Sequence, residues 1–266
     1  FWCMEHFVTV KPKSPLISKY ISYYYFHDSD KTDPQRSFVF YPHFKHGFTA
    51  YKTGDSFITR YTMNYDRQIR VSLPEPFRKL GVAFHPLGIN HFISEPISRL
   101  HHKDTLTFSH WNPDIFPELE AIYEAKEPEQ KRDLLDQLFE KRFRPNPDLQ
   151  IVQQAVTAIF NSFGTIQVDE LAQEIGVSRK TLLRHFRKHL DCSIEAYKKV
   201  VKFRTSIQAA HNQGLKNLTE VSLYSLYYDQ SDFTNRFKEL TGQNPTAFFA
   251  SIRQMGDEDI FWKIDG

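Results

Sequence analysis

The sequence predicts an α+β protein of two domains. We expect a β-rich, barrel- or sandwich-like N-terminal domain and an all-α C-terminal domain with two helix-turn-helix motifs. The first 110 residues are rich in aromatic and β-branched residues and have frequent turn signals. Two closely spaced prolines, Pro145 and Pro147, then interrupt the chain. Beyond them apolar residues recur at helical spacing, and one helical pattern occurs twice.

Composition is that of an ordinary globular protein with reduced cysteines. The 266 residues are enough for two domains that each bury a core. Hydrophobic residues make up 40% and charged residues 25%. Cys3 and Cys192 are the only cysteines, which excludes a disulfide framework and a cysteine-rich zinc site. We expect free thiols, no secretory signal and no membrane span, and therefore a cytoplasmic protein.

Short strands are expected throughout residues 1–112, which we assign to a β-rich sensor domain. The predicted strands are Tyr20–Phe26, Ser37–Tyr41, Phe48–Tyr51, Ser56–Tyr65, Gln68–Leu73 and Leu80–Phe84. Proline, glycine and aspartate interrupt the pattern between them. Many short strands at this spacing are typical of a β-sandwich or barrel.

Residues 113–143 are predicted to form a helical segment for coupling or dimerisation. The two helices are expected over Pro113–Ala125 and Glu129–Phe143. Leu134 and Leu138 lie on one face of the second helix, and this apolar stripe is the reason to expect a homodimer.

The rest of the chain divides into a linker, a helical domain and a tail. Residues 144–149 form the expected linker, because two prolines interrupt a helix and resist collapse. Residues 150–254 form the expected DNA-binding domain, and residues 255–266 the C-terminal tail.

The segment from Val168 to Leu190 has the pattern of a helix-turn-helix, whose second helix can lie in the major groove. Gly176 can take a positive φ at the turn. Ser178 can then cap the second helix by accepting a hydrogen bond from a free backbone N–H. The inward positions of the second helix are Leu182, Phe186 and Leu190.

The outer side of this second helix is mostly basic. The residues expected to contact DNA from it are Arg179, Lys180, Leu183, Arg184, Arg187 and Lys188. Arg184 is the candidate for a base contact, because a guanidinium can pair with guanine O6 and N7. A phosphate contact and a plain surface charge are the alternatives for Arg184.

The distribution of charge along the chain indicates nucleic-acid binding more strongly than the small net charge of +2 does. Residues 178–204 carry nine Lys or Arg against two acidic residues. Ser193 is expected to cap a long connecting helix within this range. Lys198, Lys199, Lys202 and Arg204 should lie mostly outward on it, and we assign DNA contacts to Lys198 and Lys202 through phosphate neutralisation. A solvated helix surface is the alternative.

The segment from Leu218 to Leu240 repeats the pattern. Phe233 and Phe237 should face inward. The residues expected to contact DNA are Gln230, Ser231, Thr234, Asn235 and Lys238. An amide side chain such as that of Gln230 or Asn235 can read adenine. Because an outward Asp232 would repel phosphate, we expect this copy to be the weaker reader.

The helical domain resembles the AraC/XylS family of bacterial transcription regulators over about Gln150–Gln254. The residues that carry the resemblance are Glu170-Leu171-Ala172, Ser178, Leu182, Arg184-His185-Phe186, Asp229-Gln230-Ser231-Asp232-Phe233, Phe237-Lys238 and Thr241-Gly242-Gln243-Asn244-Pro245. The resemblance implies a sequence-specific regulator whose two reading helices enter adjacent major-groove segments, about 34 Å apart. Its implied partners are double-stranded DNA and RNA polymerase.

This sequence departs from the family pattern at a few positions. Leu226 stands where the family usually has a turn glycine, and Ser222 where it has alanine. Asp191 replaces a glycine after the first reading helix, but aspartate tolerates left-handed geometry better than most residues. Leu183 stands where the family often has a polar reader, and can touch a thymine methyl or simply pack. The changes around Leu226 again point to weaker reading by the second unit.

The N-terminal domain carries a shorter resemblance. The stretch Lys79–Asn90 is similar to a segment of sensor domains attached to these regulators. This implies a domain that binds a small-molecule effector, dimerises, or both. Its aromatic residues suit an apolar pocket, with ordinary core packing as the alternative. We assign no residue to effector or cofactor binding.

No pattern for metal binding or catalysis is recognised. His43 and His46 are three residues apart, but the spacing of a cupin metal site is missing. Neither cysteine has a recognisable histidine partner, and there is no nucleophile elbow or phosphate-binding glycine loop. We therefore expect no metal site, no cofactor, no catalytic residue and no enzyme activity. The alternatives are an enzyme or a protein-interaction domain fused to a DNA-targeting module.

Overall fold

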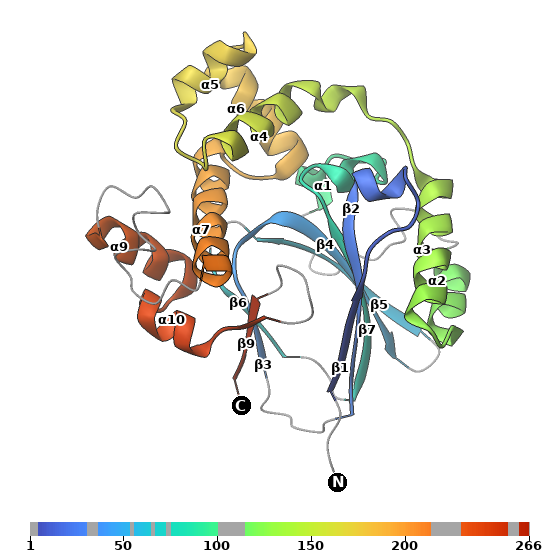
Figure 1. Ribbon diagram of the computed structural model, residues 1–266. Coiled ribbons are helices and arrows are strands. Elements are labelled where there is room, and N and C mark those ends of the chain that lie inside the picture. Colours follow the sequence, from blue (N-terminus) through green and yellow to red (C-terminus); the bar gives the residue numbers. More distant parts are fainter. Residues whose placement is uncertain are drawn as a thin grey trace.

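Two antiparallel sheets dominate the first part of the chain, and helices the second (Figure 1). The computed structural model describes residues 5–30, 37–53, 56–64, 67–72, 76–100, 115–213, 230–254 and 261–265. Within these residues the strand-rich region and the helical region lie side by side. The predicted α+β fold class is therefore confirmed.

The larger sheet has five strands in the order β1-β2-β7-β4-β5. Their bounds are Glu5–Val10 (β1), Ile21–Ser29 (β2), Phe77–Phe84 (β7), His43–Thr53 (β4) and Ser56–Asn64 (β5). All neighbouring strands in it are antiparallel. The sequence predicts four of these strands and misses β1, because the single polar-apolar alternation in EHFVTV is too short to stand out.

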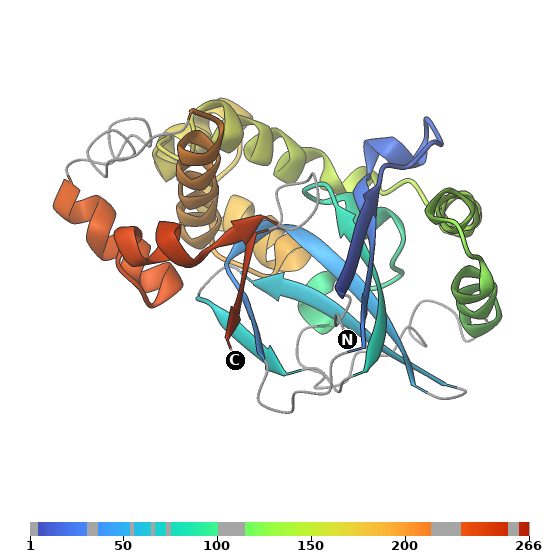
Figure 2. The ribbon, with the colours of Figure 1, turned by 60° about the horizontal axis from the view of Figure 1, so that its bottom comes forward.

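The smaller sheet pairs a strand near the C-terminus with strands of the N-terminal region. Its order is β6-β3-β9-β8. The bounds are Ile69–Ser72 (β6), Ser37–Phe40 (β3), Phe261–Asp265 (β9) and Arg253–Gln254 (β8). The final strand β9 pairs antiparallel with β3, and Figure 2 shows it (red) at the end of the chain marked C. Part of the expected C-terminal tail thus lies in the sheet of the N-terminal domain.

Helices α2 (Ile115–Glu124) and α3 (Pro128–Arg142) lie along one side of the larger sheet (Figure 1). Leu135, Leu138 and Phe139 of α3 are buried in the same apolar cluster as the inner residues of that sheet. Leu134 packs against this cluster too. The Leu134 and Leu138 stripe is therefore largely covered by its own domain, and a homodimer stays a prediction.

Asp136 holds α3 to the start of the chain. Its carboxylate accepts hydrogen bonds from the backbone N–H groups of Lys13 and Ser14, each at 2.8 Å. It also accepts one from the hydroxyl of Tyr24 at 2.8 Å. Burial and the neighbouring Asp136 carboxylate raise the pKa of Tyr24, so the phenol stays protonated and keeps donating.

Burial of His46 on β4 is expected to make the fold sensitive to acid. Its side chain is 1% exposed, and burial lowers its pKa from 6.5 to about 3. The unfolded chain therefore gains a proton at this residue first, so stability present above about pH 6.5 is lost as the pH falls toward the folded-state pKa. We expect the free energy of unfolding to fall by about 1.5 kcal/mol between about pH 6.5 and 5 from this residue. Urea unfolding at several pH values measures it, and an equal fall in His46→Gln would contradict the assignment.

The two regions share packed surfaces. Val39 and Tyr41, at and after β3, lie in one apolar cluster with Phe203, Phe237 and Phe248 of the helical region. The Tyr41 and Phe248 rings meet edge to face at 4.7 Å between centroids. The contact between Tyr41 and Phe248 crosses between the domains, so the helical domain is held against the smaller sheet as well as by the chain.

Candidate nucleic-acid interface

The helical domain is built around one long helix, α7. The linker contains the short helix η4 (Pro147–Leu149). The helices after it are α4 (Gln150–Asn161), α5 (Val168–Ile175), α6 (Arg179–Leu190), α7 (Ile194–Gln213), α9 (Gln230–Thr241) and α10 (Pro245–Ser251). In Figure 1, α7 runs from the α4–α6 group toward α9 and α10. It therefore joins the first helix-turn-helix to the described part of the second.

The turn between α5 and α6 follows the prediction. Gly176 has φ 75° and ψ 30°, the left-handed conformation that glycine adopts without strain. The N–H of Gly176 donates to Gln173 O at 3.1 Å and that of Val177 to Ala172 O at 3.0 Å, which is a Schellman ending. Ser178 then caps α6 by accepting from the Thr181 N–H at 3.1 Å.

Helix α6 has a buried apolar side and an exposed basic side. Leu182, Phe186 and Leu190 are each 0% exposed, as their four-residue spacing predicts. The exposed members of the predicted set on this helix are Arg179, Lys180, Arg184, Arg187 and Lys188. Asp191 ends the helix with φ 54°, the left-handed geometry expected of it.

These basic side chains differ in whether they form an ion pair with an acidic residue. Arg179 pairs with Asp169 at 3.2 Å, and Lys188 pairs with Asp148 of the linker. Arg184 and Arg187 are exposed and form no ion pair with any residue that the structure describes. Leu183 is half-buried and packs on the domain core, which agrees with the packing alternative.

Two basic residues of α7 lie inward, contrary to the prediction. Lys198 is 6% exposed, and its ammonium donates to the Glu195 carboxylate at 3.1 Å. Arg204 is 7% exposed and donates to the backbone oxygens of Pro42 at 2.6 Å and Tyr41 at 3.1 Å. Helical periodicity places Lys198 and Arg204 outside the apolar face of α7. It cannot show that the N-terminal domain covers the polar face of the helix at Arg204.

The two remaining basic residues of this group lie beside α9. Lys199 pairs with Glu239 of α9 at 3.1 Å. Lys202 is half-buried; burial lowers its pKa, while the charge of Asp232 opposes that shift. Both therefore also tie α7 to α9 by charge.

Helix α9 begins at Gln230, as predicted. Phe233 and Phe237 are both 0% exposed. Of the predicted contacts, Gln230, Ser231, Asn235 and Lys238 are exposed and Thr234 is half-buried. Asp232 pairs with Arg236 at 3.4 Å, so its charge is partly balanced within the helix.

The helix ending after α9 also matches the sequence pattern. Gly242 has φ 70°, and Asn244 caps α10 by accepting from the Ala247 N–H at 2.8 Å. Pro245 occupies the first turn of α10. The first helix of the second motif, with Ser222 and Leu226, lies outside the described residues.

Two features went unpredicted. A groove of about 420 Å³ lies between the domains, lined by Phe44, Lys45 and Leu87 on one side and by Val156 and Phe160 of α4 on the other. Its lining comes from distant parts of the sequence, so no local pattern marks it. The second feature is a cluster of Asp148, His185 and His189. The four-residue spacing of the two histidines was visible in the sequence, but the third member comes from the linker.

Comparisons with known proteins match the helical region. The family model of the helix-turn-helix domain matches residues 171–251. The Msm operon regulatory protein of Streptococcus mutans is 28% identical over 103 residues. That alignment covers 38% of this chain and 37% of the regulatory protein, so the similarity spans just over a third of that relative.

Solved structures of ToxT from Vibrio cholerae resemble most of the chain. One has a TM-score of 0.44 and 11% sequence identity, covering 93% of this chain and 97% of that one. Another, of ToxT with a bound unsaturated fatty acid, has a TM-score of 0.39 and 12% identity, covering 92% and 94% of the two chains. No helix in the described part of the present protein is long and apolar enough to span a membrane.

Proposed function

We propose that this chain, whose C-terminal domain is a helix-turn-helix domain of the AraC type, is a sequence-specific DNA-binding regulator of transcription. The observation that carries the proposal is the exposed basic side of α6. It sits on a helix fixed by a Schellman turn and a serine cap, on the opposite side from a fully buried apolar stripe. A rigid helix with one buried and one basic side suits docking in a major groove.

Each exposed basic side chain of α6 has a proposed part in binding. Arg184 is exposed and unpaired among the described residues, so it can turn its guanidinium toward a guanine edge. Arg187, Lys180 and Arg179 suit phosphate oxygens, which give affinity without sequence preference. Lys188 can do the same once it leaves Asp148.

Helix α9 and α7 supply the remaining proposed contacts. Gln230 and Asn235 are exposed amides that can read adenine. The proposed backbone contacts are Ser231, Thr234, Lys238 and Lys202. Lys198 is left out, because Glu195 already holds its ammonium.

Control by a small molecule is part of the proposal. The groove of about 420 Å³ is within the range of ligand pockets, about 300–1,000 Å³. It is lined by aromatic rings from both domains, and Phe44 and Phe160 in this lining pack edge to face with 4.8 Å between centroids. A bound apolar effector would therefore touch the strand-rich domain and α4 together, and can change how they sit.

The regulatory role brings further proposed partners. RNA polymerase is the partner on which a transcription regulator acts, and a homodimer would double the DNA contacts. Residues other than the Leu134 and Leu138 stripe would have to form that dimer. We also propose that the protein is not an enzyme and acts in the cytoplasm, where bacterial DNA lies.

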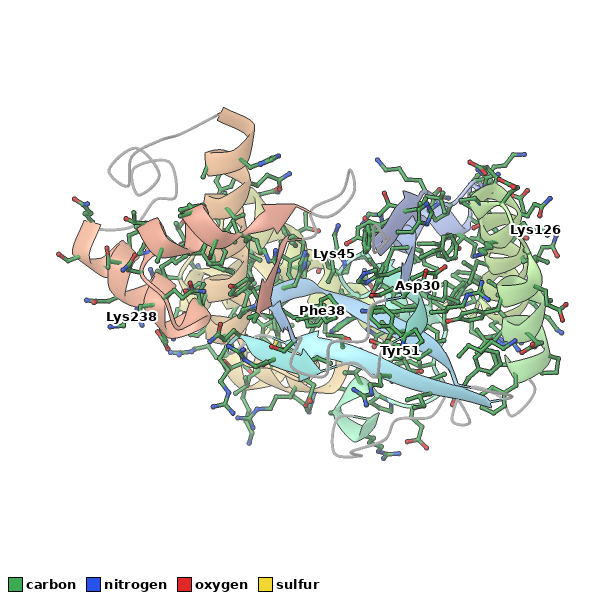
Figure 3. All side chains as sticks on the ribbon, turned by 90° about the horizontal axis from the view of Figure 1, so that it is seen from below. Asp30, Phe38, Lys45, Tyr51, Lys126 and Lys238 are labelled. Atoms are coloured by element: carbon green, nitrogen blue, oxygen red, sulfur yellow. The ribbon has the colours of Figure 1, made fainter. Side chains whose placement is uncertain are left out.

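Matched charge reversals at the two ends of the molecule test the proposal. Figure 3 shows Lys238 of α9 at one end and Lys126 at the other, and both are exposed. We expect Lys238→Glu to weaken binding to duplex DNA by about tenfold at moderate salt, because a phosphate contact becomes repulsive. The same change at Lys126 should leave affinity within about twofold. Fluorescence anisotropy measures both, and equal effects of the two variants would contradict the proposed interface.

A further inference from the structure

Three side chains that can ligate a metal ion lie close together where η4 of the linker crosses α6. Asp148 comes from η4, while His185 and His189 come from α6. One ligand atom from each lies within 4.8 Å of the other two. Histidines four residues apart share one face of a helix, and here their rings stack at 5.8 Å between centroids.

This cluster lies at the edge of the exposed basic side of α6, where Lys188 donates a hydrogen bond to Asp148. His189 is 2% exposed, and its Nε2 is 3.1 Å from the Asp148 carboxylate. Its backbone oxygen accepts a hydrogen bond from the Asn90 side chain of the N-terminal domain at 3.0 Å. The cluster therefore sits at the junction of three parts of the chain: the N-terminal domain, the linker and the reading helix.

His185 supplies an independent indication that something binds here. Its Nδ1 is buried and has no hydrogen-bond partner among the described residues. A buried polar atom without a partner is costly and uncommon in folded proteins. Coordination of a metal ion by one ring nitrogen would fix the ring and its tautomer, as metal-bound histidines usually show.

The protonation states suit ligation. Burial lowers the pKa of His189, so its imidazole is neutral near pH 7. The hydrogen bond from Lys188 lowers the pKa of Asp148, and an ordinary aspartate is also a carboxylate near pH 7, so the side chain stays ionised when Lys188 leaves. A neutral imidazole and a carboxylate are the forms that bind metal ions.

We propose that Asp148, His185 and His189 form a binding site for a divalent transition-metal ion of the zinc type. Two imidazoles and one carboxylate are a ligand set that zinc, cobalt and nickel accept, whereas magnesium and calcium prefer oxygen ligands alone. Three protein ligands leave a fourth tetrahedral position for water. This proposal departs from the sequence prediction of no metal site, which considered histidines of the N-terminal domain only.

Small side-chain movements complete the site. Ligands around tetrahedral zinc stand about 3.4 Å apart, given metal–ligand bonds of about 2.1 Å. The cluster therefore has to tighten from its 4.8 Å limit by rotation of side chains. Lys188 has to leave the carboxylate, and it can do so because its side chain is 46% exposed. An ion held in this way joins the linker to α6 and binds the folded chain only, so it raises the unfolding temperature.

Cobalt titration tests the site directly. Co²⁺ replaces Zn²⁺ in such sites and gives visible absorption bands when its coordination is tetrahedral. We expect the 266-residue chain to bind one equivalent with these bands, and Zn²⁺ to displace it. The variants His185→Gln and Asp148→Asn should each lose at least tenfold in affinity. His6→Gln, a change at an exposed histidine on β1, should bind as the parent does.

The unfolding temperature provides a second test that does not depend on the cobalt absorption bands. Zn²⁺ should raise the unfolding temperature of the parent and of His6→Gln, but not that of His185→Gln. Bands and stabilisation that are the same in His185→Gln and Asp148→Asn as in the parent would place the ion elsewhere and overturn the proposal. A parent chain that neither binds Co²⁺ nor gains stability from Zn²⁺ would overturn it as well. Neither readout involves DNA, so failure here leaves the proposed function standing.

Discussion

Replacing Arg184 with alanine is expected to weaken binding to a selected DNA site by about 1–3 kcal/mol, the discrimination that a bidentate arginine–guanine pair supplies. Binding to random duplex DNA should change little, because Arg184 would not touch phosphate in this role. Since Arg184 is exposed, the loss should not come from unfolding. Anisotropy titrations with the selected duplex and a scrambled one measure the two affinities.

Arg187→Ala is the matched control, on the same exposed side of α6. We expect it to weaken binding to both duplexes alike and to lower the slope of affinity against salt by about one. If Arg184→Ala also reduces both affinities alike, Arg184 is a phosphate contact and the base-reading role is wrong.

Phe237→Ala is expected to lower the free energy of unfolding by about 3–5 kcal/mol, the usual cost of removing a buried phenyl ring. Phe237 is 0% exposed and packs on Phe203 and Phe248, with ring centroids 5.1 and 4.9 Å away. Its cluster also contains Val39 and Tyr41 of the N-terminal domain. The cavity would therefore weaken the second helix-turn-helix and its contact with the strand-rich domain together.

Lys238→Ala is the control for this prediction. The neighbouring side chain is exposed, so its loss should change stability by no more than about 0.5 kcal/mol. Urea unfolding followed by circular dichroism measures both variants. Equal stability of Phe237→Ala and the parent would mean that Phe237 is not in the core of this domain.

Local chemistry made the first helix-turn-helix predictable. Gly176, Ser178 and Asp191 each meet a requirement of the backbone at one position: a left-handed turn, a helix cap and a left-handed ending. Such requirements are set by neighbouring atoms, so they can be read from a short stretch of sequence. The buried stripe of α6 follows from helical period for the same reason.

Long-range contacts could not be predicted in this way. Strand β9 pairs with β3, which lies more than 200 residues earlier in the sequence. The five residues of β9 carry no pattern that identifies β3 as the partner. Arg204 lies on the polar side of α7 by period, but that side faces Tyr41 and Pro42 and not solvent. A pattern of apolar residues shows which side of a helix can be buried, and not which polar side another domain covers.

The candidate metal cluster combines a part that the sequence could have predicted with a part that it could not. The spacing of His185 and His189 places two ring nitrogens on one helix face, which the sequence alone could have indicated. Asp148 joins them only because η4 crosses α6, and this crossing is a tertiary contact. A ligand set with one distant member stays hidden until the fold is known.

Selection of bound duplexes from a random DNA pool tests the central claim most directly. The chain should enrich two short blocks of specified bases about one helical turn, roughly 10 base pairs, apart. The block read by α6 should be the stronger, and it should lose its preferred guanine when Arg184→Ala is used in the selection. A pool that shows no enriched block after repeated rounds, while the chain remains folded, would contradict the account.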